Sequence, residues 1–161
     1  DLILRGVLLD IPGYKKVEHL EPGYAVTVED VKQCASWEGV EIRKGDAVLI
    51  RTGENWPEMN LAGGAGPTLE TAMYLVDQKG IFLIGDDQSA FEAFPPGKLS
   101  SFEGHVHPVH QYLLIQKGVH LMEMVQMGEL AKDKVYEFCL VILSTKIKGA
   151  TGMMVRPIAI K

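Results

Sequence analysis

Hydrophobic positions along the chain form short apolar runs, typical of buried strands, separated by amphipathic segments, typical of helices. Residues 2–11 are rich in Leu, Ile and Val and stop at Pro12-Gly13, so we expect a buried strand that ends in a turn. The pattern predicts further strands over residues 47–52, 81–85, 119–125, 137–143 and 155–160.

Helices are expected between these strands. Thr27 is a candidate N-cap, because Glu29 and Asp30 follow it and acidic side chains suit the amino-terminal end of a helix dipole. This helix should run from about Val28 to residue 36 or 37 and end near Gly39. The pattern predicts other helices over 69–78 and 109–117, with a turn or short helix at 128–131. Strands and helices alternate, so the predicted class is α/β with a mixed sheet.

Length, composition and charge indicate the kind of protein and the binding partners to expect. The 161 residues fit a single domain over 1–161, and 47% hydrophobic residues exclude extended disorder. The net charge of −5 comes from 21 acids and 16 bases that are spread along the chain. Nothing in this charge pattern favours nucleic acid or an anionic membrane as a partner. No apolar run approaches the roughly 20 residues needed to span a bilayer.

Cysteine usage bears on the compartment. Cys34 and Cys139 are too few and too far apart for a disulfide framework or a thiolate zinc site. We expect two free, largely buried thiols in a reducing compartment, and therefore a cytoplasmic protein.

Candidate metal ligands gather in one part of the sequence. His105, His107, His110 and His120 are followed by Glu123. Imidazole and carboxylate groups are ligands that Zn²⁺ and Mn²⁺ accept, and a catalytic metal needs about three of them plus an open position for water. Water on such a metal loses a proton near neutral pH and can attack a carbonyl carbon.

The spacing leaves alternatives open. Pro108 indicates that only His110 lies well inside the following helix. If 119–125 is a strand, His120 and Glu123 point to opposite faces, and one of them is structural. His105 and His107 would then be surface-loop histidines. Asp86-Asp87 follows an apolar strand and either contributes to a site or starts a turn.

The loop of residues 53–66 ends in Gly63-Gly64-Ala65-Gly66 but lacks the Lys-Ser/Thr of a phosphate-binding P-loop. Trp56 in this loop is a candidate for the wall of an apolar pocket, as are the aromatic residues between 91 and 94. The alternative is that these are ordinary, partly buried loop residues.

Several segments together resemble the cyclase family, which includes bacterial kynurenine formamidases and isatin hydrolases. The most specific match is the order Pro108-Val109-His110-Gln111, Gly118-Val119-His120 and Glu123. Other segments that match in the expected order are 5–10 with Gly13-Tyr14, 45–53, 66–67, 85–87, 149–152 and 155–158. The resemblance covers essentially the whole chain.

This resemblance implies a swivelling β/β/α fold, cyclase-like, and a hydrolase that uses Zn²⁺ or Mn²⁺. Its substrate would be a small amide or lactone, such as N-formylkynurenine or a cyclic amide. By position, His110 and Glu123 would be metal ligands, with His110 on a helix and Glu123 on a strand. Trp56 and Asp87 would line the substrate pocket, and His120 would be structural.

The family's metal site also draws on an upstream His-rich motif that ends in Asp. No His-x-x-x-His-x-Asp arrangement occurs in the 161 residues, and the chain starts with Asp1 inside an expected strand. We therefore expect the amino-terminal segment, with the catalytic histidine, to lie upstream of Asp1. The alternative is a non-catalytic binding or scaffolding module. In either case we expect a homodimer or homotetramer, because a chain that begins inside the core needs its missing strand replaced by something.

Overall fold

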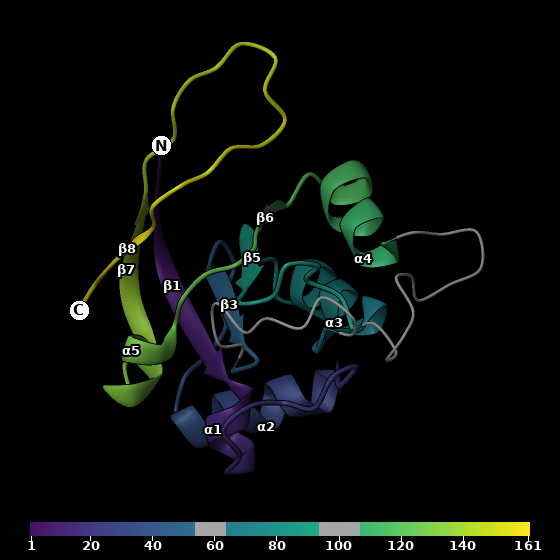
Figure 1. Ribbon diagram of the computed structural model, residues 1–161, viewed down its shortest axis with the longest axis vertical. Coiled ribbons are helices and arrows are strands. Elements are labelled where there is room, and N and C mark those ends of the chain that lie inside the picture. The colour runs from purple at the N-terminus through teal and green to yellow at the C-terminus, as the bar shows by residue number, and fades with distance from the viewer. Residues whose placement is uncertain (54–63, 94–106) are drawn as a thin grey trace.

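The structure, a computed structural model, describes residues 1–53, 64–93 and 107–161. A six-stranded mixed sheet forms its centre, in the order β6-β5-β3-β1-β7-β8 (Figure 1). Strands β1, β3, β5 and β6 are parallel, whereas β7 and β8 run antiparallel to their neighbours. The α/β prediction with a mixed sheet is therefore confirmed. The strands are β1 (Leu2–Asp10), β3 (Ala47–Arg51), β5 (Leu83–Asp86), β6 (His120–Met122), β7 (Glu137–Ile142) and β8 (Ile158–Ile160).

Helices and a small second sheet complete the fold. Strands β2 (Ala25–Val26) and β4 (Gly66–Pro67) pair in parallel. The helices are α1 (Ile11–Lys15), α2 (Val28–Glu38), α3 (Leu69–Met73), α4 (Pro108–His110) and α5 (Gly128–Lys132). Two of them continue as π-helices, α3 over Tyr74–Gln78 and α4 over Gln111–Lys117. No helix among the described residues is both long and apolar enough to cross a bilayer.

The sheet has a hydrophobic core on each face, because successive side chains of a strand point to opposite faces. Val7 and Leu9 of β1 join a core with residues of α2, α3 and the helix that begins at α4. Leu8 points the other way, into a second core that α5 helps to cover.

Local signals account for the helix that follows β2. Thr27 caps α2, and its hydroxyl accepts a hydrogen bond from the amide of Asp30 at 3.1 Å. The Asp30 carboxylate accepts one from the Thr27 amide at 3.0 Å, which completes a capping box. Gly39 ends the helix at a φ of 71°, where a side chain would be strained. The predicted N-cap and C-terminus are both confirmed.

Two local expectations were wrong. The turn expected at Pro12-Gly13 is the helix α1, because the Asp10 carboxylate caps it by accepting from the Gly13 amide at 3.2 Å. Cys34 is buried as expected, but Cys139 is exposed. The alternation along β7 explains the latter, since Phe138 and Leu140 point into the core and leave Cys139 on the other face.

The end of α2 is joined to the end of β1 through Glu38. Its Oε1 accepts a hydrogen bond of 2.7 Å from the Asp10 amide, and its Oε2 is buried without a hydrogen-bond partner among the described residues. Burial raises the pKa of Glu38 to about 8, although the Asp10 amide acts in the opposite direction.

We expect Glu38 to make stability fall as pH rises. Between pH 4.5 and about 8 the folded chain holds a proton on Glu38 that the unfolded chain has lost. The contribution of Glu38 to the free energy of unfolding is therefore full below pH 4.5 and is lost as the pH rises toward 8. Unfolding midpoints in denaturant, measured from pH 5 to 8.5, should decline more steeply for the wild type than for Glu38→Gln. Identical slopes would contradict the raised pKa.

Candidate functional site

Polar side chains gather where the parallel strands end. Asp10 pairs in register with Arg51, and Ile50 pairs with Asp86, so β1, β3 and β5 reach the same edge of the sheet. Arg51 donates to the Asp10 carboxylate at 2.7 Å. In open α/β sheets ligands bind at this carboxyl edge.

Asp87 anchors the segment that follows β3. Its carboxylate accepts hydrogen bonds from the Thr52 amide at 2.8 Å, the Thr52 hydroxyl at 2.7 Å and the Gly53 amide at 2.9 Å. Burial raises the pKa of Asp87, while these donors favour the ionised form. The side chain is thus directed at the backbone of the neighbouring segment.

Asp86 lies one residue earlier, at the end of β5, and is fully buried. Its carbonyl accepts from the Val125 amide at 2.9 Å, and the Gln88 carbonyl accepts from Met124 at 3.0 Å. These bonds hold the segment after β6 beside the end of β5. Burial and the charges of Asp87 and Glu123 raise the pKa of Asp86 well above its ordinary value.

Glu92 and His110 form the most direct contact of the site. Glu92 is 2% exposed, and its Oε1 lies 2.9 Å from the His110 amide nitrogen and 2.8 Å from His110 Nδ1. His107 Nδ1 is 3.8 Å from the same oxygen. Glu92 therefore fixes both the start of the helix and the orientation of the His110 ring.

The other ring nitrogen of His110 faces Glu123, with 3.4 Å between Nε2 and Oε1. Burial lowers the pKa of His110, but Glu123 and Glu92 outweigh it and raise the pKa to about 9. In this form His110 is a cation between two carboxylates.

The donor set fits a divalent cation. One oxygen each of Asp86 and Glu92 is buried without a hydrogen-bond partner among the described residues, and the buried Oε1 of Glu123 has only the ion pair with His110 Nε2 at 3.4 Å. Buried carboxylate oxygens are costly unless a cation or a donor satisfies them. Ligand atoms of Glu92, His107 and His110 also lie within 4.8 Å of one another, which is close enough to share one ion.

The backbone is strained at the same positions. Phe91, His107 and Met124 have φ values of 56°, 62° and 60°, in the left-handed region that residues other than glycine rarely adopt. Phe91 directly precedes Glu92, His107 is itself a candidate ligand, and Met124 directly follows Glu123. Such strain concentrates at functional sites, where packing holds it in place.

The residues predicted from sequence come together only in part. His110 and Glu123 are brought into contact, which the sequence pattern left open. Asp87 directly follows Asp86, but its carboxylate contacts Thr52, so its role in a substrate pocket stays a prediction. Trp56 lies outside the described residues, as does His105. His120 is exposed, and its ring lies tilted against that of Phe82, with ring centroids 5.0 Å apart.

Glu92 and His107 were missed. The sequence pattern indicates a surface loop for His107, and Glu92 lies in an aromatic segment whose pattern indicates only an apolar pocket wall. One signal was available: Asp86, Asp87 and Glu92 place three acids within seven residues after an apolar strand.

Known proteins identify the family. The Cyclase family model matches residues 1–93, more than half of the chain. A crystal structure described as a novel cyclase is 30% identical over 98% of this chain and 53% of its own, with a TM-score of 0.82. The chain therefore belongs to the cyclase family, as its sequence motifs indicated. No curated protein matches it.

Other solved structures share the fold at lower identity. Isatin hydrolase A from Ralstonia solanacearum is 17% identical, with a TM-score of 0.75 over 99% of this chain and 60% of its own. A potential metal-dependent hydrolase with cyclase activity is 21% identical, with a TM-score of 0.64 over 98% of this chain and 65% of its own. The fold is thus cyclase-like, and the chain spans between about half and two thirds of the length of these structures.

Proposed function

We propose that this chain is part of a metal-dependent hydrolase that opens an amide or formamide bond in a small molecule, such as N-formylkynurenine or a cyclic amide. The contact between His110 and Glu123, with unsatisfied carboxylate oxygens around it, is the observation that carries the proposal. Membership of the cyclase family and the hydrolases among its structural neighbours support the same class of reaction.

His110 Nε2 and Glu123 would hold the metal in this proposal. Nitrogen and carboxylate donors suit Zn²⁺ and Mn²⁺. When bound, such an ion polarises a carbonyl group and makes water nucleophilic near neutral pH. Glu92 keeps the proton on Nδ1 of His110. Once Nε2 has lost its own proton, Nε2 is therefore the ring nitrogen that binds the metal.

A second arrangement uses the other ring nitrogen. Glu92, His107 and His110 Nδ1 could hold an ion among themselves. This set would break the hydrogen bond between Glu92 and the His110 ring, and it would leave Glu123 without a role. We therefore favour Nε2.

His110 and Glu123 are fewer than the three protein ligands that a catalytic metal needs. We propose that the remaining ligands and the catalytic histidine belong to a part of the whole protein without a counterpart in residues 1–161. We further propose a homodimer or homotetramer. If the whole protein holds no metal, the alternative of a non-catalytic binding or scaffolding module is favoured instead.

Glu123→Gln should lower metal occupancy and amide turnover together in the whole protein, each by at least about tenfold, because it removes an anionic ligand. Elemental mass spectrometry measures the metal, and hydrolysis of a formamide measures turnover. Glu129→Gln is the matched control, since Glu129 is exposed and pairs only with Lys132 at 3.8 Å among the described residues.

Histidine variants separate the two arrangements. His107→Gln should leave most of the metal bound if Nε2 of His110 is the donor, and should release it if the second set is used. Unchanged metal content and turnover in Glu123→Gln would rule Glu123 out as a ligand.

A further inference from the structure

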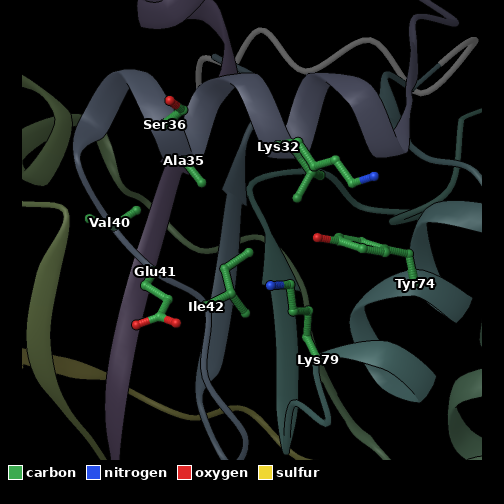
Figure 2. A pocket seen from close by; sticks show the side chains of 9 residues that line it. Lys32, Ala35, Ser36, Val40, Glu41, Ile42, Tyr74 and Lys79 are labelled. Atoms are coloured by element: carbon green, nitrogen blue, oxygen red, sulfur yellow. The ribbon is translucent and has the colours of Figure 1, made fainter.

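A hollow of about 230 Å³ lies between α2, the segment after it and the π-helix Tyr74–Gln78 (Figure 2). It shares no residue with the candidate metal centre. Its apolar lining includes Val31, Ala35 and Ile42, all of which belong to the buried core. Lys32, Tyr74 and Lys79 add polar groups to the lining.

Two ammonium groups converge on one aromatic ring in this hollow. Lys32 Nζ lies 5.1 Å from the centre of the Tyr74 ring, and Lys79 Nζ lies 5.9 Å from it. Figure 2 shows Lys32 reaching the ring from α2 and Lys79 approaching from the opposite side, with the Tyr74 hydroxyl directed into the hollow.

Within residues 1–53, 64–93 and 107–161, no ion pair is made by either of these two charges. Four other lysines in the described part of the chain form ion pairs, namely Lys15, Lys117, Lys132 and Lys161. Lys32 and Lys79 form none with any described residue. Glu41 also lines the hollow, but its carboxylate is 3.2 Å from Arg43 Nε and is largely exposed. Two positive charges on either side of the Tyr74 ring would stabilise an anion bound at the edge of that ring.

The rare π-helix creates this arrangement. The Lys79 amide donates to the Tyr74 carbonyl at 3.2 Å, a bond between residues five apart. An i to i+5 bond stacks Lys79 over Tyr74, whereas an α-helix would turn the two side chains to different sides. Single turns of π-helix occur frequently at functional sites.

We propose that this hollow binds a small organic carboxylate. The carboxylate would lie at the Tyr74 hydroxyl and accept a hydrogen bond from it, where the ammonium groups of Lys32 and Lys79 attract it from either side of the ring, and a compact apolar body would cover Val31, Ala35 and Ile42. At about 30 Å³ for each water-sized group, the hollow holds roughly seven or eight such groups. The apolar floor and the two point charges fit a carboxylate better than a phosphate, which is usually bound by several backbone amides or arginine forks.

The probe that tests this is 3-methylbutanoate, with 3-methylbutanol as its neutral counterpart. Titration of the isotope-labelled full chain should give saturable NMR shifts at residues 32, 42, 74 and 79, with a dissociation constant on the order of 1 mM. The alcohol should bind at least about tenfold more weakly, because it lacks the charge that the lysines recognise.

Lys79→Gln and Lys32→Gln should each weaken binding about tenfold, and Lys79→Arg should retain it. Lys132→Gln, the control, removes the same charge from an exposed position and should bind as the wild type does. The proposal is overturned if the shifts do not saturate at millimolar concentrations or if both glutamine variants bind normally. Equal binding of inorganic phosphate would overturn the assignment to a carboxylate.

Discussion

Glu92→Gln is expected to weaken metal binding by about 10- to 100-fold. Glu92 Oε1 receives both the backbone amide and Nδ1 of His110, at 2.9 and 2.8 Å. Glutamine keeps the shape of the side chain but removes the charge that holds the proton on Nδ1, so Nε2 is no longer fixed as the free donor. Competition with a chelator of known affinity, monitored on the whole protein, measures the change.

Two controls make this result interpretable. Glu129→Gln removes one negative charge from an exposed position outside the site and should leave the metal affinity unchanged. The unfolding midpoint of Glu92→Gln must also be measured, because Glu92 is almost fully buried. An unchanged metal affinity in a folded Glu92→Gln protein would show that Glu92 does not orient His110.

Asp87→Ala is expected to lower the free energy of unfolding by about 3–5 kcal/mol. The carboxylate accepts from the Thr52 amide, the Thr52 hydroxyl and the Gly53 amide, all within 3.0 Å. Alanine would leave these buried donors without their acceptor, and each unsatisfied donor is costly. Denaturant unfolding with an unchanged m-value would measure the loss.

Asp87→Asn should lower the free energy of unfolding by less than Asp87→Ala does, because the amide oxygen of asparagine still accepts one or two of these hydrogen bonds. Asp133→Ala is the exposed control and should leave the midpoint unchanged. If Asp87→Ala is as stable as the wild type, then the segment after β3 does not depend on this carboxylate, and Asp87 is available for a substrate.

The elements that could be predicted from sequence are those with local causes. Thr27 and Asp30 are three residues apart and satisfy each other's backbone groups, so the start of α2 is encoded in a few residues. The apolar runs of β1 and β3 predict buried strands for the same reason. The π-helices could not be predicted, because Tyr74–Gln78 and Gln111–Lys117 have the same apolar spacing as α-helices.

The site was predicted only where a family motif marked it. His110 and Glu123 belong to such a motif, but their contact depends on the parallel pairing of β5 and β6. Glu92 is 18 residues from His110 in the sequence. No local pattern shows that a carboxylate between two aromatic residues is buried, since its burial depends on a partner that only the fold supplies.

The edge of the sheet where β1, β3 and β5 end has a consequence for evolutionary change. Most residues of the central strands pack into one of the two cores, whereas Asp87, Glu92 and His110 lie on the segments that follow or connect the strands. Substitutions in those segments can therefore alter chemistry without repacking the core. The same division fits a fold that matches isatin hydrolase A at a TM-score of 0.75 over 99% of this chain, although only 17% of the residues are identical.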